Sequence, residues 1–195
     1  MSRNPPLAPA SSMIDPGSTL TWDVAAARSA AAAHLWHTGA LWAHVQGVGA
    51  LGESWLATGR VPGRVAVAAW LLEIGHGPLV RDTGFPPLDG ARFLDAVRAP
   101  ACVVSLVAYH SGARAEAEER GLARELSQFR QPPPADLDLL TLLELSVGSS
   151  GQPMEPERRL AEVVVDHDPV GRRAVERSRN DLLAAVARAA ARVGV

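Results

Sequence analysis

The sequence predicts an all-α fold, and two observations support that prediction. Apolar residues recur at helical spacing along the chain, and glycine, proline or a capping residue stands between the helical segments. No segment predicts a sheet. We therefore expect a bundle of about eight or nine helices that forms a single domain over residues 18–195. A disordered arm rich in Pro, Ser and Gly is expected before it, at residues 1–17.

The composition is that of an ordinary globular domain. The net charge of the 195 residues is −2, with both signs interspersed, so no nucleic-acid footprint is expected. All 19 basic residues are arginine, which excludes catalysis by a lysine amine. No window approaches the roughly 18 apolar residues of a membrane span, and the first residues lack the apolar core of a signal peptide. We expect a cytoplasmic protein with no nucleic-acid or membrane partner, either a monomer or a small oligomer such as a homodimer.

Two helices are expected in the N-terminal third of the chain. The first is the alanine-rich run that begins at Thr21, with Ser18 or Thr21 as its cap. Thr38 is placed to cap the second helix, and Gly59 to end it. His44 is the one titratable residue in the apolar centre of this second helix. We expect its ring to be buried, with both nitrogens in need of partners.

The next helix, Val65–Gly75, is apolar on every face and is therefore expected in the core. Its one ionisable residue is Glu73. An unpaired buried carboxylate costs several kcal/mol. Glu73 must therefore meet a cation, a hydrogen-bond network or a metal, or else bind a proton.

Six further helices complete the bundle. They are expected at residues 88–97, 101–110, 115–129, 136–148, 156–167 and 168–193. Tyr109 and His110 end one apolar helix, and the thiol of Cys102 is expected to be inert in the core near its start. The 115–129 helix is expected to expose a solvated charged face. Glu144 stands alone in the centre of a leucine-rich helix.

Four polar residues thus interrupt otherwise apolar helices, namely His44, Glu73, His110 and Glu144. Polar groups buried singly in separate helices are costly unless they meet. The sequence therefore predicts one shared, buried polar centre.

The letters around these residues resemble a known family. Residues 70–78, WLLEIGHGP, are similar to the L-H-D-I-G-x and L-H-D-I/L-G-H-G-P patterns of the HD superfamily of metal-dependent phosphohydrolases. The segment WAHVQGV around His44 resembles the family's first histidine helix, x-H-S/T-x-x-V. Glu144 stands where the family places its final aspartate, in a pattern like A-D-M-T-T-G. The resemblance spans roughly residues 35–150 and implies the all-α HD fold.

The chain departs from the family at the metal-binding and phosphate-binding positions. Leu72 and Glu73 replace the defining His-Asp pair, and Pro86 replaces the histidine of G-F-H-P-L-D-G-A. Tyr109 replaces the first histidine of H-H-S-G-A, and Glu144 replaces an aspartate. The residues that flank these positions match the family patterns, so the substitutions are concentrated at the metal-binding and phosphate-binding positions.

The resemblance implies roles for seven residues. It implies a single divalent ion, Mn²⁺, Fe²⁺ or Zn²⁺, bound by His44, Glu73 and Glu144. It also implies catalytic roles for His76, which would contact a substrate phosphate, and for His110, which would act as general acid or orient water. Tyr109 and Arg114 are the candidate substrate-binding residues.

Two functional hypotheses follow, and a purely structural or interaction module is a third. In the first, the metal has been lost, and His44 as imidazolium pairs with one glutamate while His110 pairs with the other. The remodelled pocket then binds a small-molecule ligand or supports altered chemistry. The alternative is a metal-dependent phosphohydrolase acting on a nucleotide or another phosphate ester. We favour the first, because Leu72 cannot coordinate a metal.

Overall fold

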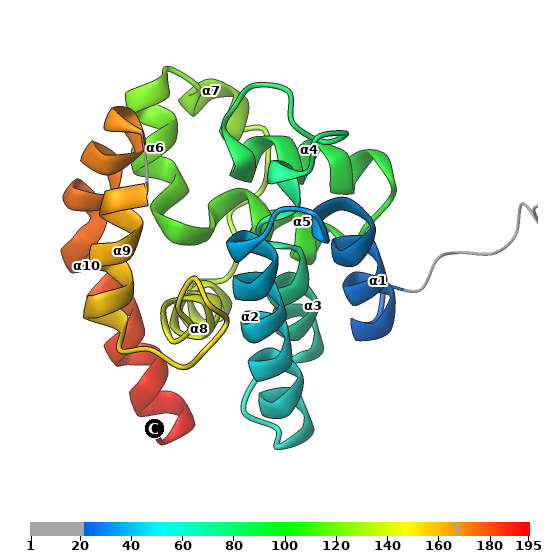
Figure 1. Ribbon diagram of the computed structural model, residues 1–195, viewed down its shortest axis with the longest axis vertical. Coiled ribbons are helices and arrows are strands. Elements are labelled where there is room, and N and C mark those ends of the chain that lie inside the picture. Colours follow the sequence, from blue (N-terminus) through cyan, green and yellow to red (C-terminus); the bar gives the residue numbers. More distant parts are fainter. Residues whose placement is uncertain (1–21, 167) are drawn as a thin grey trace, which may run out of the picture.

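The computed structural model describes residues 22–166 and 168–195 (Figure 1). The predicted arm at residues 1–17 and the candidate caps Ser18 and Thr21 lie outside this part of the chain. The all-α prediction is confirmed, since the described residues form nine helices of eight residues or more, a one-turn helix and two short 3₁₀ turns, with no strand. The elements are α1 (Val24–Leu35), α2 (Ala40–Ala57), α3 (Gly63–Leu71), η1 (Ile74–His76), α4 (Pro86–Ala96), α5 (Ala101–Tyr109), η2 (His110–Gly112), α6 (Ala113–Arg120), α7 (Ala123–Leu126), α8 (Pro134–Leu145), α9 (Pro156–Asp166) and α10 (Pro169–Val193).

Helix α3 is the central helix of the bundle, as its apolar sequence predicts. Every residue from Val65 to Leu72 is buried, and α3 packs against α1, α2, α5 and α8. The helix ends earlier than predicted, at Leu71, and the 3₁₀ turn η1 follows. Glu73 therefore lies between the two elements rather than inside a helix.

Two groups of helices lie on either side of α8. Helices α1, α2 and α3 pack together on one side, and α6, α9 and α10 pack together on the other (Figure 1). Helices α9 and α10 share a small apolar cluster with the end of α8, which includes Leu145, Leu160, Val175 and Leu182. The polar residues singled out above lie between the two groups.

Close backbone packing holds η1 against α4. A Cβ at Gly75 would overlap the carbonyl oxygen of Pro86, so only glycine allows this approach. Asp89, which is fully buried, accepts hydrogen bonds from the backbone N–H groups of Asp82, Thr83 and Gly84. The retained letters G-F-x-P-L-D-G thus organise the loop before α4.

Several local predictions change in the structure. Gly39 rather than Thr38 precedes α2, while the Thr38 hydroxyl donates to the Leu35 carbonyl and so closes the end of α1. The predicted 115–129 helix breaks into α6 and α7 at Gly121, whose φ is +71°. Cys102 is exposed rather than buried, because the first turn of α5 lies at the surface. Gly59, with φ +73°, ends α2 as predicted.

No helix within residues 22–166 or 168–195 is long and apolar enough to cross a membrane.

Candidate functional site

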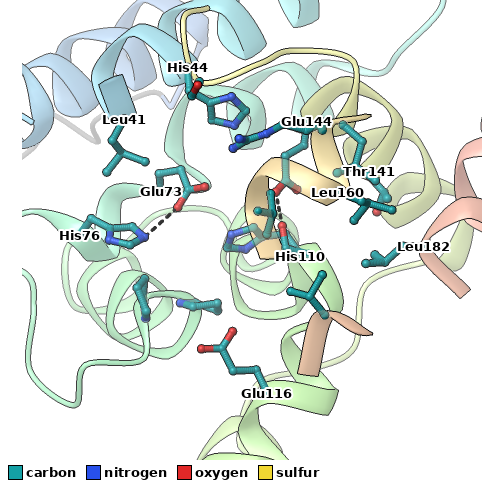
Figure 2. Close-up of a pocket in the computed structure, with 18 of the residues that line it drawn as sticks. Leu41, His44, Glu73, His76, His110, Glu116, Thr141, Glu144, Leu160 and Leu182 are labelled. Carbon is teal, nitrogen blue, oxygen red and sulfur yellow. Dashed lines mark hydrogen bonds and ion pairs between the residues drawn. The ribbon is translucent and has the colours of Figure 1, made fainter. Parts of the chain in front are cut away.

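A pocket of about 510 Å³ opens between the two helix groups (Figure 2). Figure 2 shows side chains from α2, the α3–η1 junction, η2 and α8 directed toward a common space. The four residues expected to share a polar centre all line this pocket, namely His44, Glu73, His110 and Glu144. Their apolar neighbours come mainly from α8, α9 and α10 and include Leu145, Leu160, Val163, Val175 and Leu182.

His44 is 1% exposed and points into the pocket from α2. Its Nδ1 lies 3.3 Å from the Gly148 carbonyl oxygen. A carbonyl can only accept, so Nδ1 carries the proton and the neutral ring presents Nε2 as an acceptor. This Nε2 is buried and has no hydrogen-bond partner. Burial and then the positive charge of Arg159 lower the pKa of His44, although Glu73 and Glu144 act against this shift.

Glu144 reaches the same pocket from α8 and is 5% exposed. One carboxylate oxygen accepts a hydrogen bond from the Ser111 hydroxyl. The other oxygen, Oε2, is buried and has no partner. Ser111 is held in the left-handed region, with φ +51° and ψ +31°, a conformation that costs a non-glycine residue about 1 kcal/mol or more. The strained turn η2 thus places a hydroxyl donor on Glu144.

Glu73 and His76 form an ion pair at one edge of the pocket, with Oε2 and Nε2 separated by 3.1 Å. Burial raises the pKa of Glu73, but the hydrogen bond and charge of His76, with smaller contributions from His110 and His44, outweigh burial and lower it well below 4.5. Burial alone would lower the pKa of His76, but its bond to Glu73 raises it above 6.5. The two residues stand three positions apart, a spacing that brings side chains together on a helical turn.

His110 is 2% exposed, and its Nδ1 lies 2.7 Å from the Val107 carbonyl oxygen. Nδ1 therefore donates, and Nε2 remains for contact with a bound molecule. In its neutral form this ring can accept a proton at Nε2 but cannot donate one there. The predicted pairing of His44 and His110 with the two glutamates is not formed. Instead, Glu73 pairs with His76 and Glu144 with Ser111.

Sequence reasoning missed the charged residues that α6 and α9 contribute to the pocket. Arg159 of α9 is 9% exposed, its Nη1 lies 3.4 Å from Glu162 Oε2, and its buried Nε has no partner. Glu116 and Arg120 of α6 form an ion pair at 2.7 Å, and Arg120 also reaches Asp168 at 3.0 Å. The sequence predicts a solvated charged face for the 115–129 segment and only a helix for residues 156–167, so these charged residues were not expected in the pocket.

Two predicted substrate-binding residues lie away from the pocket. The hydroxyl of Tyr109 donates to the Leu126 and Phe129 carbonyl oxygens, at 3.2 and 3.0 Å, and so anchors the segment after α6. Arg114 is exposed on α6 and is not part of the pocket lining. Neither residue is part of the pocket lining that the proposed site uses.

Only two of the three residues predicted to bind a metal ion present a free ligand atom. His44 Nε2 and Glu144 Oε2 are free, but Glu73 is engaged with His76. Among the described residues, no three His, Cys, Asp or Glu side chains lie close enough together to hold an ion. Leu72, at the position of the family's histidine, is fully buried in the apolar core and does not line the pocket. A metal bound by His44, Glu73 and Glu144 therefore stays a prediction.

No protein-family model, curated protein or solved structure matches this chain. The resemblance to HD phosphohydrolases rests on the sequence patterns given above.

Proposed function

We propose that this chain is a divergent HD-like protein whose pocket binds a small organic ligand, by way of His44 and Glu144. The observation that carries the proposal is that His44 Nε2 and Glu144 Oε2 are both buried acceptors without a donor. Leaving such an atom unsatisfied costs about 1–3 kcal/mol. Because two acceptors cannot satisfy each other, a bound molecule that donates to both would recover that free energy.

The size and lining of the pocket support this proposal. A volume of about 510 Å³ lies within the 300–1,000 Å³ typical of small-molecule sites, which combine apolar walls with a few placed polar groups. Here Leu160, Val175 and Leu182 provide an apolar wall. A ligand with a polar donor end and an apolar body therefore fits both parts.

Acid–base chemistry on a bound ligand is part of the proposal. His110 Nε2 can accept a proton, and the ion-paired His76 can donate one. Both residues line the pocket. Their catalytic roles rest on this placement and on the family resemblance.

The proposal is tested by measuring the Tm of the chain in the presence of each compound of a library of small polar molecules. At least one chemical class should raise the Tm of the wild-type chain. The shift should disappear in Glu144→Leu, which removes the free acceptor, and should persist in Glu157→Gln, which changes an exposed carboxylate on α9. Equal shifts in wild type and Glu144→Leu would contradict the proposal.

Metal-dependent hydrolysis of a phosphate ester is the second candidate. It is favoured by His44, whose Nδ1 is anchored on a backbone carbonyl while Nε2 is free, as in metal-ligating histidines. Elemental mass spectrometry after incubation with Mn²⁺, Fe²⁺ or Zn²⁺ tests this candidate. Near-stoichiometric metal that is lost in His44→Ala would favour it, and absence of metal under every condition would count against it.

A further inference from the structure

The polar end of the pocket contains a third buried atom without a partner, and this atom is a donor. Arg159 Nε carries an N–H and is unpartnered, like the acceptors His44 Nε2 and Glu144 Oε2. His44 and Glu144 are 1% and 5% exposed, and the side chain of Arg159 is 11% exposed. They come from α9, α2 and α8 and line one pocket.

The charged side chains that line the pocket are equal in number for the two signs. Four carboxylates line it, and three arginines and the ion-paired His76 oppose them; the carboxylates belong to Glu73, Glu116, Glu144 and Asp168, and the arginines are Arg81, Arg120 and Arg159. His44 is neutral, because burial and the charge of Arg159 lower its pKa, and its Nδ1 donates to the Gly148 carbonyl. A charged ligand would leave its own charge without compensation in a buried site, which is costly. The lining therefore favours a neutral ligand.

The hydrogen-bonding type of the buried atoms without a partner then indicates which polar group of a ligand the site prefers. The buried atoms of this pocket that lack a partner are two acceptors and one donor, so a group that satisfies all three carries two donors and one acceptor. A primary carboxamide or a urea has two N–H donors and one carbonyl acceptor, and both groups are neutral. A carboxylate only accepts, and an amidinium or ammonium only donates.

We propose that the pocket selects a neutral primary carboxamide or urea attached to an apolar body, with the head group at His44, Glu144 and Arg159. The two N–H groups donate to His44 Nε2 and Glu144 Oε2, and the carbonyl accepts from Arg159 Nε. The apolar body lies against Leu160 and Leu182. This inference rests on the proposed ligand-binding function and names the class of ligand.

Four probes of the same shape test the inference. Cyclohexanecarboxamide, cyclohexanecarboxylate, cyclohexanecarboxamidine and cyclohexyl methyl ketone differ in the head group alone. Dissociation constants are measured for the full chain by calorimetry at pH 7.5. The carboxamide should bind at least tenfold more tightly than each of the other three, because each of those leaves at least one buried polar atom of the site unsatisfied.

Two variants test whether the head group lies where the inference places it. In Glu144→Leu no acceptor remains at this position, so affinity for the carboxamide should fall at least tenfold. The ketone has no N–H group and so makes no hydrogen bond to Glu144. Its affinity should therefore fall less than that of the carboxamide. Glu157→Gln, on the exposed face of α9, should leave all four constants unchanged.

Each outcome is decisive. Tighter binding of the carboxylate or the amidinium would overturn the inference and leave the ligand-binding function standing. If none of the four probes binds at 10 mM, the inference fails. If, in addition, no library compound gives a shift that depends on Glu144, the proposed function fails with it.

Discussion

His44 of α2 and Glu144 of α8 face one pocket, and each presents a buried acceptor atom that no described group satisfies. The two residues lie on different helices that meet through the bundle core. Each is held on its far side, His44 by the Gly148 carbonyl and Glu144 by the Ser111 hydroxyl. Such second partners fix side-chain orientation and leave the free atom available to a ligand.

Glu144→Leu should change stability little while abolishing ligand binding. An apolar side chain of similar volume removes a buried charge with one unsatisfied oxygen, which is often neutral or stabilising. We expect the free energy of unfolding to stay within about 1 kcal/mol of wild type in urea denaturation. A loss above about 3 kcal/mol would show that Glu144 is a structural residue.

Ser111 tests the strain in η2 by a matched pair of variants. Ser111→Ala and Ser111→Gly both remove the hydroxyl that Glu144 accepts from, but glycine adopts φ +51° without penalty. The glycine variant should therefore be more stable than the alanine variant by about 1 kcal/mol, measured by urea denaturation. Equal stabilities would mean that the turn is not strained.

Tyr109→Phe separates anchoring from substrate binding. The hydroxyl donates to the Leu126 and Phe129 carbonyls, so its loss should cost about 1 kcal/mol and lower the Tm by about 2–4 °C. Ligand affinity should be unchanged, since Tyr109 does not line the pocket. A tenfold loss of affinity with unchanged Tm would restore Tyr109 as a binding residue.

The ion pair of Glu73 and His76 should give stability a defined pH dependence. The pKa of Glu73 is lowered in the fold, so its contribution is complete above about pH 4.5 and is lost as the pH falls. The pKa of His76 is raised, so its contribution is complete below about pH 6.5 and is lost as the pH rises through the folded-state value. The pair therefore stabilises the fold most between about pH 4.5 and about pH 6.5.

The variant Glu73→Gln tests this window. The stability difference between wild type and Glu73→Gln should be largest near pH 5.5 and should shrink at higher pH as His76 loses its proton. Denaturation at a series of pH values measures the difference. A difference that grows from pH 6 to pH 9 would contradict the ion pair.

The helices and the shared polar centre could be predicted from the sequence because both follow from burial. Residues 65–71 are apolar on every face, which favours a central helix, and α3 is buried throughout. His44 and Glu144 stand singly in apolar helices, and the cost of burying them separately favours one pocket. Both inferences need the composition of each helix face and no knowledge of distant contacts.

The partners within the pocket could not be predicted, because they depend on turns and on distant segments. The resemblance assigns Glu73 to a metal ion and His76 to a substrate phosphate, so the pairing of these two residues at i,i+3 spacing is not among the predicted contacts. Arg159 belongs to an amphipathic helix, where a solvated arginine is the ordinary expectation. Its burial arises only because α9 packs against α8 and α10.

The most direct test of the account is the protonation of the His44 ring, read by ¹H–¹⁵N correlation through two- and three-bond couplings at pH 7. His44→Gln identifies its signals. Because Nδ1 donates to Gly148 and the pKa of His44 is lowered, we expect a neutral ring with the proton on Nδ1 and a free Nε2. This Nε2 signal should shift when a donor ligand binds. A proton on Nε2, or a doubly protonated ring, would rule out the proposed ligand site, because no acceptor would then remain on His44 for a ligand.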